Sequence, residues 1–190
     1  CGPDDLGNYI QVSKIVQLFL LVLSILATSI FPITAAGGRS DVALNLQKLT
    51  RILFSLTGIA CIGLAGVGYW FFPFLFGASF HLMFFSFLII IPGILALACV
   101  YPLVAFFSGK NLLFINIKAL TLAVIMLITG DLLLIPVWGI NGAAAVSSLS
   151  YVLYYAYMLN AFSRKYNLSL SHLFLISVSD IRSLFKYDQK

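Results

Sequence analysis

Three ionisable side chains lie inside long apolar runs: Lys14, Lys118 and Asp131. At the centre of a membrane helix an ionisable group costs at least about 2.5 kcal/mol, so each of them raises a functional hypothesis. A lysine in such a run either neutralises an anionic group in a protein-lined cavity or extends its ammonium group to the lipid headgroups. An aspartate either couples to an ion or a proton, or is a helix-end acid with access to water.

A polar stripe continues from Lys14 along its predicted helix. Lys14 lies about 8 Å into that helix, at about 1.5 Å per residue. At about 100° per residue, Gln17, Ser24 and Thr28 fall on the same side, and Ser13 lies beside them. Lipid would penalise a stripe of this length, and a lysine that extends to the headgroups does not need one. We therefore predict that Lys14, Gln17 and Ser24 line a substrate-binding cavity.

Lys118 and Asp131 lie in one later run. Asn111, Thr121 and Thr129 share the face of Lys118, so this lysine either lines a cavity or reaches the nearby headgroups. Asp131 is 13 residues further on, about 140° around the helix, so the two cannot pair on it. Asp131 remains either an ion-coupling carboxylate or a helix-end acid.

Composition explains why these few charges matter. Apolar residues make up 62% of the 190 residues, charged residues only 9%, and glutamate is absent. A soluble domain carries about 25% charged residues, so most of this chain must have lipid as its solvent. The net charge of +5 does not indicate nucleic-acid binding, because the bases are scattered singly and not clustered on one face.

The predicted fold is therefore an all-α integral membrane protein. Five apolar runs are long enough to cross a hydrocarbon core of about 30 Å, which takes about 20 helical residues. They cover residues 9–31, 49–75, 82–107, 112–135 and 142–162. Proline and glycine punctuate the runs, and Pro92-Gly93 falls inside the third, where it predicts either a bend or a hinge. A sixth stretch, 168–185, is too polar to span and predicts an interfacial amphipathic helix.

Charge predicts the orientation of these helices. Nine of the 11 Lys and Arg residues fall in segments on one side of the predicted bundle, and none falls in the loops of the other side. The positive-inside rule then places the N-terminus of this chain outside and its C-terminus in the cytoplasm. Tyrosine and tryptophan favour the headgroup level of a bilayer. Four of them lie at the predicted outer ends of helices: Tyr9, Tyr69, Trp70 and Trp138.

No constellation for catalysis is evident. The sequence has no His/Glu cluster, no Ser/His/Asp set and no glycine-rich phosphate loop, so we expect no enzyme activity, no metal and no cofactor. Cys61 and Cys99 lie in apolar runs and behave as small hydrophobes. The sequence begins at Cys1 without a signal peptide, and we expect it to be a piece of a longer protein.

Three motifs resemble those of one transporter family. They are DLGNY at 5–9, followed by Lys14-Ile15 and a run that ends at Pro32, FLFG at 74–77, and LIPVWGINGAA at 134–144. Beyond the last motif, the segments Ser150-Tyr151 and 162–165 also resemble the family's pattern. In this order and spacing they resemble the polysaccharide repeat-unit flippases of the multidrug/oligosaccharidyl-lipid/polysaccharide exporter superfamily. The resemblance covers nearly the whole chain.

That resemblance implies the C-terminal part of a transporter with about 12 to 14 helices in two bundles. It implies translocation of a polyprenyl-pyrophosphate-linked oligosaccharide by alternating access, in a bacterial or archaeal cytoplasmic membrane. Its partners would be the bilayer, this substrate and the N-terminal bundle of the same protein. Lys14 and Lys118 would then neutralise the pyrophosphate. Family members usually carry a neutral residue at the position of Asp131, so the resemblance assigns Asp131 no role.

Other functions remain open. The resemblance does not distinguish a polysaccharide flippase from a peptidoglycan-precursor flippase or a teichoic acid exporter. A drug or cation antiporter of the same fold would favour acids over bases in its cavity, and here the bases outnumber the acids. A membrane polymerase or glycosyltransferase of the same pathway would need a large outer loop with Arg and acidic residues, and none lies between Cys1 and Lys190.

Overall fold

The structure, a computed structural model, describes residues 3–35, 39–77 and 82–166. These residues form four helices: α1 (Pro3–Ala35), α2 (Arg39–Phe76), α3 (Leu82–Gly109) and α4 (Leu113–Tyr166). All four contain a stretch that is long and apolar enough to cross a membrane. The prediction of an all-helical chain is confirmed for the described part, and the predicted interfacial helix at 168–185 lies outside it.

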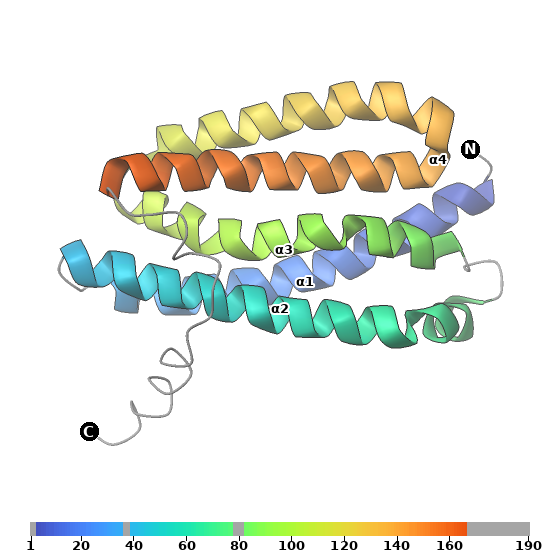
Figure 1. Ribbon diagram of the computed structural model, residues 1–190, viewed down its shortest axis with the longest axis horizontal. Coiled ribbons are helices and arrows are strands. Elements are labelled where there is room, and N and C mark those ends of the chain that lie inside the picture. The colour runs from blue at the N-terminus through green and yellow to red at the C-terminus, as the bar shows by residue number, and fades with distance from the viewer. Residues whose placement is uncertain (1–2, 36–38, 78–81, 167–190) are drawn as a thin grey trace, which may run out of the picture.

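Helix α4 consists of two antiparallel arms, residues 113–138 and 140–166, which meet at Gly139 (Figure 1). Gly139 has φ +57° and ψ −135°, a conformation that side chains disfavour, and the chain reverses there within one residue. Gly130 on the first arm faces Val146 on the second, as an antiparallel pair requires. The predicted helices at 112–135 and 142–162 therefore correspond to the two arms, but the boundary between them differs: the first arm continues through Pro136, and the helix breaks at Gly139.

The first two helices are longer than predicted. Helix α2 begins at Arg39, so Lys48 and Arg51 lie on a helix and not in a connecting segment. No proline or glycine interrupts the chain there, and a helix can continue beyond the bilayer into water. At its other end α2 passes through Pro73 and stops at Gly77, which has φ +102° and donates its N–H to the Pro73 carbonyl at 2.9 Å. This positive φ makes Gly77 the C-terminal cap of the helix.

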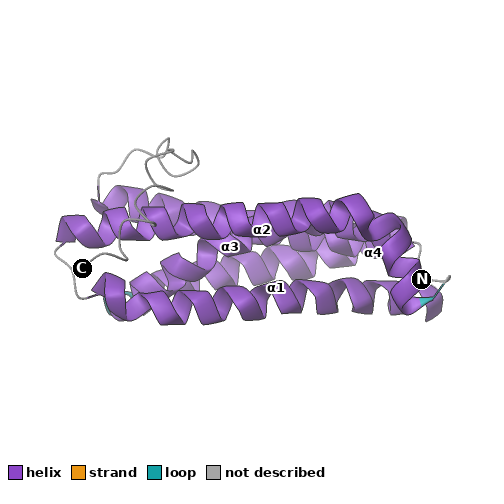
Figure 2. Ribbon diagram, turned by 90° about the horizontal axis from the view of Figure 1, so that it is seen from below, coloured by secondary structure: helices purple, strands orange, loops and turns teal. Residues whose placement is uncertain are grey.

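Helix α3 lies at the centre of the bundle. It packs against the α4 hairpin on one side and against α1 and α2 on the other, whereas α1 touches α2 and α4 only sparsely (Figures 1 and 2). Its central place explains why α3 is the most apolar helix and carries no charged residue. The bundle is thus a tight α3–α4 unit with α1 and α2 added to its other side.

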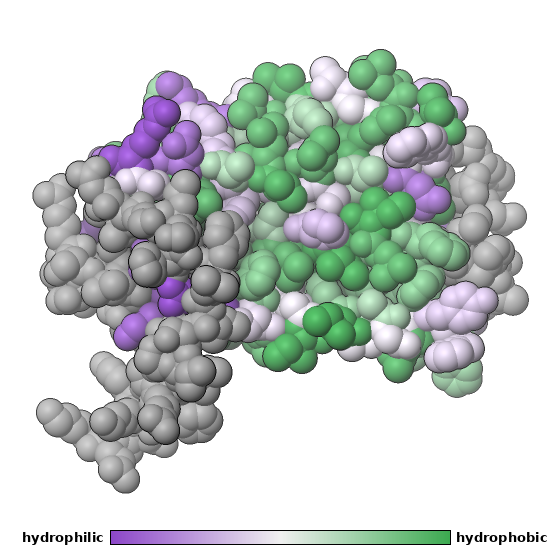
Figure 3. Space-filling view, in the orientation of Figure 1, coloured by the Kyte–Doolittle hydropathy of each residue, from purple (hydrophilic) through white to green (hydrophobic). Residues whose placement is uncertain are grey.

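The two ends of the bundle differ in chemistry. One end, named the basic end, holds Lys48, Lys110 and Arg164, and Figure 3 shows hydrophilic residues gathered there. The other end, named the aromatic end, holds Trp70 and Trp138, whose exposed fractions are 73% and 61%. Between them the surface is largely hydrophobic (Figure 3), as expected of a chain solvated by lipid.

The core is divided along the bundle. Towards the basic end, Phe106, Phe107 and Phe162 meet edge to face, with ring centroids 5.6–6.4 Å apart. Towards the aromatic end, Phe72 and Phe87 pack together among residues of α1, α2 and α3. Edge-to-face pairs of this kind stabilise by about 0.5–1.5 kcal/mol beyond their burial. Aromatic packing therefore holds α3 to α4 at one end and to α2 at the other.

Candidate functional site

The predicted cavity residues of α1 lie on its open side. Lys14 and Gln17 are exposed, whereas the face that packs against the other helices is formed by Val12, Val16 and Leu23. The hydroxyl of half-buried Ser24 donates to the carbonyl of its own helix at Leu21, at 2.8 Å. The described helices thus cover one side of α1 and leave the polar stripe uncovered.

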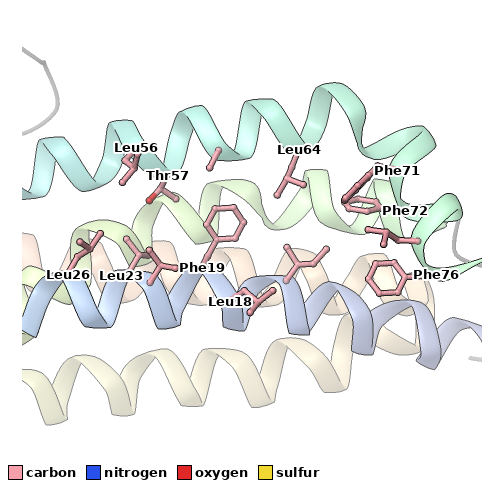
Figure 4. A pocket seen from close by; sticks show the side chains of 14 residues that line it. Leu18, Phe19, Leu23, Leu26, Leu56, Thr57, Leu64, Phe71, Phe72 and Phe76 are labelled. Carbon is pink, nitrogen blue, oxygen red and sulfur yellow. The ribbon is translucent and has the colours of Figure 1, made fainter.

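An apolar groove runs between α1 and α2 (Figure 4). Its volume is about 420 Å³. Leu18, Phe19 and Val22 line it from α1, and Leu56, Leu64 and Phe72 line it from α2. The one hydrogen-bonding side chain among its described lining residues is Thr57. Such a groove suits a hydrocarbon chain and not a sugar or a phosphate.

The groove and the polar stripe lie on different sides of α1. At about 100° per residue, Lys14 lies roughly 110° from the middle of the groove-lining face, and Gln17 and Ser24 lie roughly 170° from it. None of these three residues lines the groove. The cavity predicted for them is therefore not this groove, and a cavity around the stripe needs a wall beyond the described residues.

Lys118 lies apart from Lys14. It is exposed near the start of α4 at the basic end, and its Nζ is 4.7 Å from the ring centroid of Phe114, one turn earlier. A cation–π contact at an exposed site is worth about 0.5–1 kcal/mol and holds the ammonium close to the helix. Because Lys14 belongs to the other half of the bundle, the structure does not bring the two predicted cations into one site.

Asp131 lies on the first arm of α4, eight residues before the reversal at Gly139. Its Oδ1 is buried and accepts no hydrogen bond from any described residue. Tyr151 on the second arm is close enough to interact electrostatically with Asp131 and with Tyr9 of α1. The Asp131 side chain as a whole is only partly buried, so the structure agrees with a helix-end acid as well as with an ion-coupling carboxylate.

Polar contacts that the sequence does not reveal hold the helices together near the aromatic end. The buried Asn8 side chain of α1 accepts the backbone N–H of Met83, at 3.1 Å. That amide belongs to the first turn of α3 and has no partner within its own helix. The Tyr9 and Ser147 hydroxyls share a hydrogen bond of 3.2 Å, which ties α1 to α4.

A second pair of contacts fixes α3 to α4. The Ser86 hydroxyl donates to the side-chain oxygen Oδ1 of Asn141 at 2.8 Å, and the Gly93 N–H donates to the Ser148 hydroxyl at 3.0 Å. The Gly93 contact lies next to Pro92, whose ring removes one donor from the helix. The sequence predicts either a bend or a hinge at Pro92-Gly93. In the structure, Ser148 of α4 accepts a hydrogen bond from this position of α3.

Together these observations define the class of the protein. It is a helical membrane protein in which a polar stripe and an apolar groove lie on two sides of α1, next to a tightly joined α3–α4 unit. No protein-family model, curated protein or solved structure matches the chain. Family membership therefore rests on the motifs at 5–9, 74–77 and 134–144 and remains an expectation.

Proposed function

We propose that this chain is part of a flippase that moves a polyprenyl-pyrophosphate-linked oligosaccharide across a cytoplasmic membrane. The observation that carries the proposal is the uncovered polar stripe of α1, headed by Lys14. Lys14 and Gln17 lie inside a 20-residue apolar span, Gly7–Leu26, and both are exposed. A lysine there costs about 2.5–3.5 kcal/mol if it faces lipid, so the stripe is better explained as one wall of a wet path.

The chemistry of the two sides of α1 fits the two parts of such a substrate. The pyrophosphate and sugars need charge and hydrogen-bonding groups, which Lys14, Gln17 and Ser24 offer. The polyprenyl tail needs a hydrocarbon surface, which the groove between α1 and α2 offers. Helix α1 separates these two surfaces. The headgroup of the substrate can therefore cross along the polar side, in contact with water, while the polyprenyl tail stays among apolar side chains.

The packing of the helices supports a movement of this kind. Alternating access is largely a rigid-body motion of one group of helices against another. Helices α3 and α4 are joined by hydrogen bonds and close packing, whereas α1 has few contacts with α2. Under the proposal, α3 and α4 move as one body, and the interface between α1 and α2 adjusts.

Substitutions at Lys14 test the proposal. In the complete protein, Lys14→Ala and Lys14→Gln should lose transport, and Lys14→Arg should retain part of it, because charge is what the pyrophosphate requires. Transport is measured as complementation of a flippase-deficient strain, with membrane insertion quantified for each variant. Lys48→Ala is the matched control, because it removes an exposed lysine from the basic end. Normal transport by Lys14→Ala would show that the stripe does not bind the substrate.

A further inference from the structure

A second hollow opens at the basic end, between the two arms of α4. Its volume is about 380 Å³, and we name it the α4 basic hollow. Among the described residues, Ile115 lines it from the first arm, and five residues line it from the second arm. These are Tyr157, Asn160, Ala161, Arg164 and Lys165.

The lining residues of the second arm have helical spacing. Intervals of three or four residues separate Tyr157 from Asn160 and Ala161, and these two from Arg164. This spacing places all four residues on one face of the helix. This face presents a phenol, an amide and a guanidinium side by side, with Lys165 next to them. Among the described residues that line the hollow none is acidic, and neither base forms an ion pair with a described residue.

The α4 basic hollow lies at the level where a bilayer has its headgroups. The apolar stretch of α4 begins at Leu113 and ends at Lys165, so both arms leave the hydrocarbon core beside the hollow. Tyrosine favours this level, and arginine and lysine extend to it from helix ends. Ile115 and Ala161 lie partly buried against the neighbouring core, which gives the hollow an apolar floor.

We propose that the α4 basic hollow binds the phosphate of an anionic membrane lipid. Arg164 and Lys165 would neutralise the phosphate, Asn160 and Tyr157 would bond its oxygens or the glycerol, and the apolar floor would receive the start of an acyl chain. Basic pockets between spanning helices recognise lipid headgroups by this combination of charge and apolar surface. The inference does not depend on the proposed function, because it concerns a resident lipid and not the transported one.

Native mass spectrometry of the complete protein in detergent tests the inference. Titration with phosphatidylglycerol should give bound lipid at concentrations where phosphatidylcholine gives none. Arg164→Gln and Lys165→Gln should each weaken phosphatidylglycerol binding about fivefold, since one base near the membrane surface contributes about that factor. Asn160→Trp places an indole ring in the hollow without a change of charge, so it should obstruct the headgroup and abolish the preference for phosphatidylglycerol.

Lys110→Gln is the matched control, because Lys110 is an exposed base at the same end that does not line the hollow. A loss with Lys110→Gln as large as with Arg164→Gln would show diffuse attraction to charge and overturn the inference. Normal binding by Asn160→Trp would also overturn it. Displacement of the lipid by an equal concentration of inorganic phosphate would assign the hollow to free anions. Helicity measured by circular dichroism establishes that each variant is folded.

Discussion

Replacement of Gly93 by alanine should separate α3 from α4. A Cβ at this position would lie 2.7 Å from the Ser148 Cα, whereas ordinary contacts begin at 3.4 Å, so the two backbones must move apart by at least 0.7 Å (3.4 minus 2.7). Overpacking of this kind costs about 1–3 kcal/mol. This movement also lengthens the hydrogen bond from Gly93 to Ser148, which measures 3.0 Å in the structure. Its loss lowers the free energy of unfolding by about a further 0.5–1.5 kcal/mol.

The better helix propensity of alanine offsets about 1 kcal/mol of this loss. We therefore expect Gly93→Ala to lower the free energy of unfolding by about 2 kcal/mol. Gly63→Ala is the matched control, because a Cβ there would have no described heavy atom within 4 Å apart from the local backbone of its own helix, and it should raise the free energy of unfolding by up to about 1 kcal/mol. Ser148→Ala removes the hydroxyl but adds no clash, so its free energy of unfolding should lie between those of Gly63→Ala and Gly93→Ala.

Reversible unfolding in mixed micelles, titrated with sodium dodecyl sulfate and followed by circular dichroism, gives these free energies. The expected order of stability is Gly63→Ala, wild type, Ser148→Ala and Gly93→Ala. Stability of Gly93→Ala within about 0.5 kcal/mol of wild type would refute the close approach of the two helices, because an overpacked backbone contact cannot be that cheap.

Three further predictions concern other parts of the bundle. Asn8→Leu should lower the free energy of unfolding in the same assay by about 1–3 kcal/mol, because the Met83 amide is then buried without an acceptor; an unchanged value would contradict this bond. Asp131→Asn should be at least as stable as wild type, since it removes a charge whose Oδ1 has no described partner, and a clear loss would show that the carboxylate is stabilised by residues outside the described part. Cysteines placed at Ser40 and Ala78 should react with impermeant reagents from opposite sides of the membrane, and labelling of both from one side would contradict the predicted orientation.

Apolar runs were enough to predict most of the helices. Spans of more than 20 apolar residues leave lipid as the main solvent, and only helices satisfy the backbone there without partners. The reversal in α4 could not be predicted in detail, because Pro136 and Gly139 both signal a break. Which of them turns the chain depends on the packing of the two arms. The combination of φ +57° and ψ −135° at residue 139 strongly favours glycine, and Pro136 fits within the helix.

The candidate site was harder to predict than the fold. Hydropathy identifies Lys14 and Asp131 as unusual, but it does not reveal which neighbours face them. In the sequence, nothing distinguishes Asn8 and Ser148 from other polar residues. Their roles become visible only in the structure, where Asn8 accepts the backbone N–H of Met83 and Ser148 accepts the backbone N–H of Gly93. Pro92 is the one signal of these contacts, since a proline within a spanning helix requires that neighbouring side chains satisfy the backbone.

The position of the polar contacts constrains how α1 can move under the proposed function. Its described side-chain hydrogen bonds to other helices, from Asn8 and Tyr9, both lie near the aromatic end. Further along α1, the contacts with α2 and α3 are apolar, as at Leu23, and the groove leaves part of this surface unfilled. Apolar side chains slide past one another at lower cost than hydrogen bonds break within a membrane. Under the proposed function, helix α1 would therefore pivot most easily about its Asn8 end, and such a pivot would move the remainder of the polar stripe, from Lys14 to Ser24, relative to α3 and α4.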